Sequence, residues 1–242
     1  MKIINKIKQK ATDNMNQPPV TSAFLGDSVT QGCFEVYVKK DGNVETIFDK
    51  ECAYHHYLAK ILALLYPTVP VNIINAGISG DNAPHGLKRL QTDVLSHNPD
   101  MTVVCFGLND SAAGKENIGK YTAALRDIFK TIQEHNLEVI FMTPNMMNIG
   151  VSDHVTDERI KAIARNTMKT QLDGTLDLYV EEAKKVCEAS QVKVCDCYEK
   201  WKTLYRNGVD ITELLANKIN HPLREMNWLS AISLVETMME EE

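Results

Sequence analysis

The stretch MTVVCFGLND, residues 101–110, places an almost unbroken apolar run directly before glycine, asparagine and aspartate. A continuous apolar run, rather than an alternating one, is typical of a strand that a parallel sheet buries on both faces. The polar residues follow at the point where this strand would end. Because ligands of open parallel sheets bind beyond the carboxyl ends of the strands, we expect chemistry at such junctions.

Four more apolar runs lie along the chain and have the same character as Met101–Phe106: Val20–Leu25, Val71–Asn75, Leu137–Met142 and Val192–Cys195. Helical periodicity separates them, over Cys52–Tyr66, His85–Ser96, Ile118–His135, Leu176–Ala189 and Leu223–Met239. This alternation predicts an α/β fold, a three-layer α/β/α sandwich around a five-stranded parallel sheet. Residues 34–50 and 145–172 lack clear strand periodicity and are expected to be loops or insertions that shape a site.

The composition favours one globular domain over residues 1–242, because 44% of the residues are hydrophobic and no repeat or linker interrupts the chain. Residues 1–18 form a leader segment, which we expect to be a short amphipathic or frayed helix. Lysines interrupt this leader, so it lacks the apolar stretch of a signal peptide. No run approaches the roughly 18 apolar residues of a membrane span. Whether a signal peptide was removed stays open.

Charge and cysteine usage narrow the classes of partner. A net charge of −6 disfavours a general nucleic-acid binder and leaves small molecules as the expected ligands. The six cysteines show neither CxxC pairs nor zinc spacing, which indicates reduced thiols and a cytoplasmic location. With no GxGxxG or Walker A string, we expect neither a cofactor nor a metal. The sequence leaves the oligomeric state open.

Three of the expected strand exits carry residues suited to acyl transfer. Ser28 follows the first run, Gly80 lies in the loop after the second, and Asn109 follows the third. A nucleophilic serine needs a base, and its oxyanion needs donors. The backbone N–H of Ser28, the N–H of Gly80, where no Cβ blocks close approach, and the side-chain amide of Asn109 are candidate donors.

A histidine must then supply the base. His221 lies in Asn220-His221-Pro222, a polar connection before the last helix, from which its side chain can reach over the sheet edge. The other histidines lie within expected helices, at their ends or in loops: His55, His56, His85, His97, His135 and His154. His221 is therefore the candidate base.

The strings GDSVTQG, NAGISGD, GLND and NHP together resemble the four signature blocks of the SGNH (GDSL) hydrolase family, in the family's order, from residue 26 to residue 222. The resemblance implies a flavodoxin-like SGNH fold with Ser28 as nucleophile and His221 as general base. It also implies an oxyanion hole built from Ser28, Gly80 and Asn109. The implied activity is metal-independent hydrolysis of a carboxylic ester through an acyl-enzyme, with a short acyl group such as acetyl on a carbohydrate.

The sequence departs from the family pattern at Lys218, where an aspartate usually stands three residues before the histidine. A lysine cannot accept a hydrogen bond, so another acceptor must hold the Nδ1–H of His221, or the site is a Ser-His dyad. Candidate acceptors are Asp210, Asn217 and a backbone carbonyl. Asp210 has an alternative role as the N-cap of a helical turn at Ile211–Leu215.

The missing carboxylate keeps other functions open. Within the family, a lysophospholipase or a thioesterase is the nearest alternative. A catalytically weak or idle α/β/α binding domain is the alternative from another class, and a flavodoxin-like cofactor binder is a third.

Overall fold

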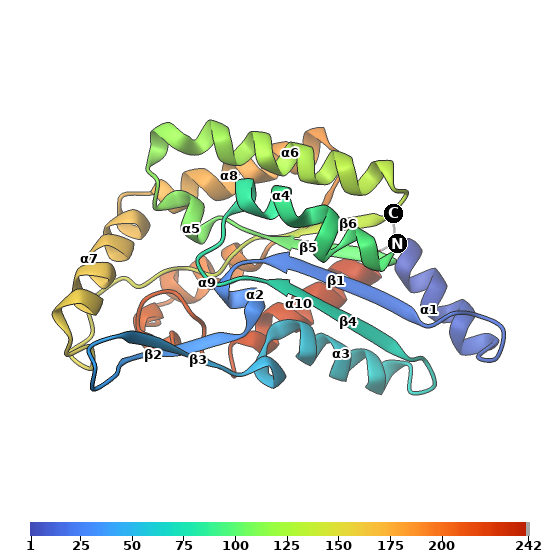
Figure 1. Ribbon diagram of the computed structural model, residues 1–242, viewed down its shortest axis with the longest axis horizontal. Helices are drawn as coiled ribbons and strands as arrows, with labels where there is room; N and C mark the ends of the chain where they lie inside the picture. The colour runs from blue at the N-terminus through green and yellow to red at the C-terminus, as the bar shows by residue number, and fades with distance from the viewer. Residues whose placement is uncertain (241–242) are drawn as a thin grey trace.

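A parallel sheet of five strands forms the centre of the molecule in the computed structural model, which describes residues 1–240 (Figure 1). The strands are β1 (Val20–Gly26), β4 (Val71–Gly77), β5 (Met101–Cys105), β6 (Glu138–Met142) and β7 (Lys193–Cys195). Their order across the sheet is β4-β1-β5-β6-β7, and every neighbouring pair is parallel. The predicted five-stranded parallel sheet is confirmed, with each apolar run forming one strand.

Helices cover both faces of this sheet, as Figure 1 shows. One face packs against α4 (Ala83–Asp93), α6 (Ile118–Glu134) and α8 (Thr175–Ala189). The other packs against α1 (Lys2–Thr12), α3 (Tyr54–Leu65), α9 (Cys197–Arg206) and α10 (Asn227–Met239). The predicted three-layer sandwich is therefore confirmed. Residues of the expected leader form α1, whose Ile3 and Ile7 are buried in the core.

Strand β5 shows why the apolar runs are unbroken. Val103 packs into the core on the α3 and α10 face, and Val104 packs into the core on the α6 and α8 face. Successive strand residues point to opposite faces, so a strand covered on both sides needs apolar residues at consecutive positions. Within the strand only the buried Thr102 carries a polar side-chain oxygen, and the polar site residues follow after the strand ends.

The expectation of irregular structure at residues 34–50 and 145–172 was partly wrong. An antiparallel hairpin of β2 (Cys33–Val38) and β3 (Val44–Phe48) occupies most of the first segment. Helix α7 (Glu158–Leu172) lies in the second and buries only Ile160, Ala164 and Gln171. So few buried positions give a weak helical pattern in the sequence. Helix α9 was not predicted either.

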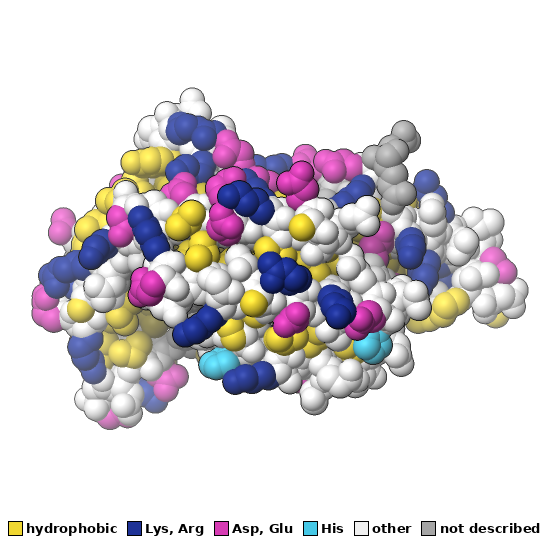
Figure 2. Space-filling view, turned by 90° about the horizontal axis from the view of Figure 1, so that it is seen from above, with side chains coloured by type: hydrophobic (Ala, Val, Ile, Leu, Met, Phe, Trp, Pro, Cys, Tyr) yellow, Lys and Arg dark blue, Asp and Glu magenta, His cyan; other side chains and the backbone are white. Residues whose placement is uncertain are grey.

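Short helices complete the chain and lie mainly at turns: α2 (Ser28–Gln31), α5 (Leu108–Ser111), η1 (Lys50–Cys52), η2 (Leu95–His97), η3 (Lys115–Asn117) and η4 (Ile211–Leu214). Basic and acidic side chains are interspersed over the face that Figure 2 shows. Within residues 1–240, no helix has the length and apolar character needed to cross a bilayer.

Candidate active site

Ser28 is the first residue of α2, directly beyond the carboxyl end of β1. Asp27 caps this short helix, because its carboxylate accepts the N–H of Val29 at 3.0 Å. Ser28 is only 3% exposed. Its own N–H lies in the first turn and has no acceptor among residues 1–240, so the N–H is available to a ligand.

Close packing of α2 on the strand ends depends on Gly77. A Cβ at this position would lie 2.2 Å from the backbone nitrogen of Gln31, which no side chain tolerates. The glycine therefore lets α2 approach the end of β4 and fixes the position of Ser28 over the sheet.

His221 lies beside Ser28 although 193 positions separate them in the chain. The Nε2 atom of His221 is 3.0 Å from the Oγ atom of Ser28. His221 is 7% exposed, so the contact is largely shielded from water. The structure thus brings together the serine and the histidine that the sequence singled out.

Asn217 holds the backbone around His221. Its side-chain oxygen accepts the N–H groups of Ile219, Asn220 and His221 at 2.9–3.0 Å. The N–H of Ala216 in turn donates to the carbonyl oxygen of His221 at 2.7 Å. This side-chain oxygen is engaged by backbone donors, so Asn217 shapes the loop rather than contacting the imidazole.

The acceptor facing Nδ1 of His221 is the backbone carbonyl of Phe34, at 2.8 Å. A carbonyl only accepts, so Nδ1 must carry the hydrogen and Nε2 must present its lone pair to Ser28. Lys218 points elsewhere and binds Glu213 at 2.7 Å. Asp210 caps η4 by accepting the N–H of Thr212 at 2.9 Å. Of the three acceptors considered from sequence, the backbone carbonyl is the one in contact.

Arg224 fixes the strand that carries the Phe34 carbonyl. Its guanidinium makes a bidentate pair with Glu35, at 2.5 and 3.0 Å, and a further bond of 2.9 Å with Asp49. The same guanidinium lies 4.4 Å from the centroid of the Phe34 ring. Arg224 follows His221 by three residues, so the clamp joins the histidine loop to the hairpin.

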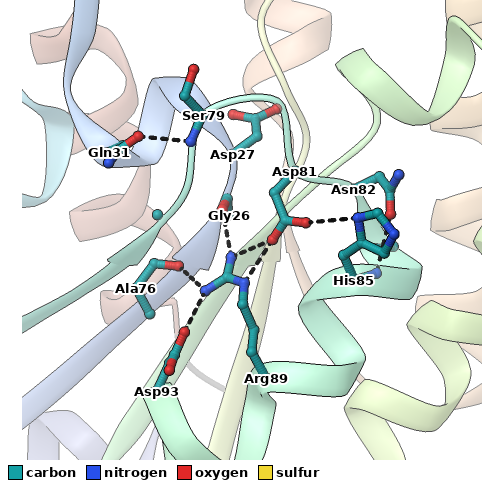
Figure 3. Close-up of polar contacts among 12 residues, drawn as sticks. Gly26, Asp27, Gln31, Ala76, Ser79, Asp81, Asn82, His85, Arg89 and Asp93 are labelled. Carbon is teal, nitrogen blue, oxygen red and sulfur yellow. Dashed lines mark hydrogen bonds and ion pairs between the residues drawn. The ribbon is translucent and has the colours of Figure 1, made fainter.

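Gly80 and Asn109 lie on neighbouring loops. The Nδ2 atom of Asn109 donates to the carbonyl oxygen of Asp81 at 2.8 Å, which leaves its second N–H free for another acceptor. Gly80 has a φ of +77°, a conformation that favours glycine. Across the described chain the Gly80 N–H has no acceptor. The N–H of Ser79 donates to the Gln31 side chain at 2.7 Å, which ties this loop to α2 (Figure 3).

Arg89 joins the strand ends to the Gly80 loop, as Figure 3 shows. Its guanidinium donates to the carbonyl oxygens of Gly26, at 2.9 Å, and Ala76, at 2.6 Å. It also donates to the buried carboxylate of Asp81 at 2.6 Å and to Asp93 at 3.1 Å. One side chain on α4 therefore holds the exits of β1 and β4 in register with residues 79–81.

Burial changes the proton affinities of groups around this site. Burial raises the pKa of Asp27 to about 7, although the Val29 N–H opposes the change. Burial likewise raises the pKa of Asp110, which accepts the N–H of Ala83, to about 7. For His221, burial lowers the pKa below its ordinary value of 6.5, and the bond to Phe34 only partly offsets this. The imidazole is therefore neutral at pH 7.

The remaining histidines do not contact Ser28. His55 is buried beneath α2, where its Nε2 lies 3.0 Å from the carbonyl oxygen of Thr30. Burial lowers its pKa to about 4. His85 faces Asp81 at 3.6 Å and is exposed. Within residues 1–240, no group of three or more His, Cys, Asp or Glu side chains is arranged to hold a metal ion.

Sequence reasoning missed Phe34, Arg224 and Arg89. A backbone acceptor leaves no trace in residue identity, because every residue carries a carbonyl. The sequence contains a weak indication of Arg224, because this arginine closely follows the NHP string. In the structure it pairs with two acidic residues of the segment 34–50. Arg89 carried none that separates it from an ordinary surface residue of an amphipathic helix.

Comparison with known proteins identifies the family of this chain. Residues 24–229 match the model of the GDSL-like lipase/acylhydrolase family. The chain belongs to this family. The match spans all four sequence blocks and both the Ser28 and His221 loops.

Among curated relatives of this GDSL-like protein, an acetylxylan esterase from Geobacillus stearothermophilus is 27% identical over 130 residues. This alignment covers 50% of the chain and 58% of the esterase. A lipoprotein of Bacillus subtilis (strain 168), described as uncharacterized, is 33% identical over 78 residues, or 30% of the chain and 32% of the lipoprotein.

Solved structures share the fold over nearly the whole chain. A crystal structure of an acetylxylan esterase from Geobacillus stearothermophilus superposes with a TM-score of 0.66 at 20% identity, and covers 92% of this chain and 95% of that one. An acetyl xylan esterase named AlAXEase gives 0.67 at 22% identity, with coverage of 91% and 100%. At these identities the likeness concerns the fold alone.

Proposed function

We propose that this GDSL-like protein hydrolyses carboxylic esters through an acyl-enzyme on Ser28. The observation that carries the proposal is the chain of contacts from Ser28 Oγ to His221 Nε2, at 3.0 Å, and from His221 Nδ1 to the Phe34 carbonyl, at 2.8 Å. This arrangement gives the serine a neutral base with its lone pair already directed at the hydroxyl.

The reaction proceeds in two balanced steps. Ser28 Oγ attacks the ester carbonyl carbon while its proton passes to Nε2 of His221. The bond from carbon to the alcohol oxygen then breaks, and Nε2 gives that proton to the departing alcohol. A water molecule attacks the acyl-enzyme in the same way, which releases the carboxylic acid and returns a proton to Ser28.

The oxyanion formed in each step is stabilised by three donors in this proposal: the N–H of Ser28, the N–H of Gly80 and the second amide hydrogen of Asn109. Support comes from the lack of a protein acceptor for either backbone N–H within residues 1–240. Donors already held in place need no reorganisation when charge develops, which makes them effective in a shielded site.

Phe34 replaces only part of what a triad carboxylate does. Its carbonyl fixes the orientation and the tautomer of His221. The correct tautomer is what is lost when a triad aspartate becomes asparagine, at a cost of about 10⁴ in rate. A carbonyl dipole stabilises the imidazolium less than a full negative charge does. We therefore expect an active enzyme that is slower than one with a carboxylate.

The proposed substrate is an ester with a short acyl group, such as acetyl on a carbohydrate. The acetylxylan esterase relative supports this substrate class. The low exposure of Ser28, at 3%, favours a small acyl group over a long chain. A preference for hydrolysing esters with longer acyl groups would indicate a lysophospholipase, and a preference for thioesters would indicate a thioesterase.

A panel of esters tests the proposal. The rate of hydrolysis is measured for the wild type, Ser28→Ala and His221→Ala. The substrates are p-nitrophenyl acetate, butyrate and octanoate, acetylated xylooligosaccharides and an acetyl thioester. We expect the acetyl esters to be hydrolysed best and both variants to lose at least about 100-fold in kcat. Equal rates of hydrolysis by the wild type and Ser28→Ala would contradict the proposed function and favour a binding domain without catalytic activity.

A cytoplasmic location is part of the proposal as well. All six cysteines are free thiols, which suits a reducing compartment. Fractionation of the native cells, with detection of the untagged protein, tests this location.

A further inference from the structure

The proposed chemistry fixes the side from which the alcohol leaves. Nε2 of His221 must give its proton to the alcohol oxygen, so this oxygen lies within hydrogen-bond reach of His221. The acyl oxygen faces Gly80 and Asn109 instead. The rest of the alcohol therefore extends along the elements that surround His221, namely the hairpin and the loop of residues 216–221.

A cleft of about 620 Å³ lies at these two elements. Residues 35–38 of β2, residues 154–157 with Ile160 at the start of α7, and residues 216–218 line it. Its volume falls within the roughly 300–1,000 Å³ of small-molecule sites. Figure 1 shows the hairpin and α7 side by side at the end of the molecule where the strands of the sheet terminate.

The cleft adjoins the catalytic histidine on two sides. Glu35 directly follows Phe34, whose carbonyl contacts His221 at 2.8 Å. Asn217 accepts the backbone N–H of His221 at 3.0 Å. Arg159 donates to the carbonyl oxygen of Gly42 at 2.7 Å, which ties the tip of the hairpin to α7.

The charged side chains in the cleft are already paired within the protein. Glu35 binds Arg224, Lys218 binds Glu213 and Asp157 binds Arg159. A charged ligand would have to compete with these partners, so the cleft suits a neutral one.

Neutral polar groups and an aromatic ring remain free in the cleft. Tyr37 is 48% exposed, and its hydroxyl has no hydrogen-bond partner within the described chain. The side chain of Thr156 is likewise exposed and unbonded in residues 1–240. Exposed aromatic surface beside uncharged donors and acceptors matches a sugar, which has apolar C–H faces and many hydroxyls.

We propose that this cleft binds the alcohol portion of the ester, a neutral oligosaccharide of two or more sugar residues, with Tyr37 as the stacking surface. The inference rests on the proposed function and deepens it, because it selects an oligosaccharide ester over a small acetylated sugar. Recognition of the alcohol is thereby placed on the hairpin and α7.

Kinetics on two substrates test the inference. Hydrolysis of acetylated xylooligosaccharides and of p-nitrophenyl acetate is measured for the wild type, Tyr37→Ala and Thr156→Val. Each variant should raise KM for the oligosaccharide ester, and the ratio of kcat/KM between the two substrates should fall about tenfold. Tyr205→Ala on α9, where the tyrosine is 39% exposed, is the matched control and should keep the wild-type ratio. An unchanged ratio in Tyr37→Ala and Thr156→Val overturns the inference.

Direct binding separates this inference from the proposed function. Calorimetry measures the binding of xylotetraose, which carries no ester, to the wild type, Tyr37→Ala and Tyr205→Ala. Binding that Tyr37→Ala weakens about tenfold or more supports the cleft, even if no ester is hydrolysed. Ester hydrolysis without any binding difference between the two tyrosine variants supports the proposed function and contradicts the cleft.

Discussion

The Nδ1 atom of His221 lies 2.8 Å from the carbonyl oxygen of Phe34, and the Nε2 atom of the same ring lies 3.0 Å from Ser28 Oγ. The imidazole thus bridges a backbone acceptor on the hairpin and a hydroxyl at the start of α2. Because the acceptor is a carbonyl, the tautomer is fixed without a carboxylate.

The activity should persist to lower pH than an ordinary histidine would allow. Burial lowers the pKa of His221, so protonation removes the base only below pH 6.5. We expect the acidic limb of kcat/KM for p-nitrophenyl acetate to have its midpoint below 6.5, which a pH profile measures. A midpoint above 6.5 would mean that a negative charge, not a carbonyl, faces the imidazole.

Loss of the Arg224 clamp should slow catalysis without weakening substrate binding. Arg224→Gln frees Glu35 and Asp49, and lets the Phe34 carbonyl drift from His221. For p-nitrophenyl acetate, which has no sugar to place in the cleft, kcat should therefore fall about 10- to 100-fold with KM little changed. Arg224→Lys should recover part of the loss. Glu45→Gln, which breaks an exposed pair with Lys39 on the same hairpin, is the control. A pure rise in KM would show that Arg224 contacts substrate instead.

Removal of the charge on Asp210 should leave catalysis intact. Asparagine caps a helical turn about as well as aspartate, so Asp210→Asn should keep both the fold and kcat within about twofold. Steady-state kinetics and thermal unfolding together check this. A loss approaching 10⁴ in kcat would identify Asp210 as the missing triad acid.

Arg89 should matter most for stability. Arg89→Met leaves the buried carboxylate of Asp81 and the carbonyls of Gly26 and Ala76 without their donor, and should cost about 3 kcal/mol of the free energy of unfolding. Urea denaturation measures the change. Lys88→Met on the exposed side of α4 should lie within about 0.5 kcal/mol of the wild type. Equal effects of the two variants would count against the role of Arg89.

The central sheet could be predicted from the sequence because burial on both faces demands apolar residues at successive positions, as in Val103 and Val104. The hairpin of β2 and β3 could not be predicted in this way. Tyr37, Val44, Ile47 and Phe48 are exposed, so no buried face imposes a period on the residues there. Helix α7 has the same difficulty, since most of its positions face solvent.

The site divides in a similar way. Ser28, Gly80, Asn109 and His221 could be singled out because they follow strand exits or occupy signature blocks, and the structure brings Ser28 and His221 into contact. The partner of His221 could not, because a carbonyl depends on where the hairpin lies rather than on which residue carries it. Lys218 showed that the usual triad carboxylate is absent, but it did not indicate which group accepts the Nδ1–H of His221.

Labelling by a fluorophosphonate tests the central claim most directly, because only a serine activated by a base reacts rapidly. The rate and site of phosphonylation are measured by intact-protein and peptide mass spectrometry for the wild type, Ser28→Ala, His221→Ala and the exposed-histidine control His97→Gln. The account predicts one label on Ser28 in the wild type and in His97→Gln, and a rate at least about 100-fold lower in His221→Ala. Labelling of Ser28 at the wild-type rate in His221→Ala, or an unlabelled wild type, would contradict it.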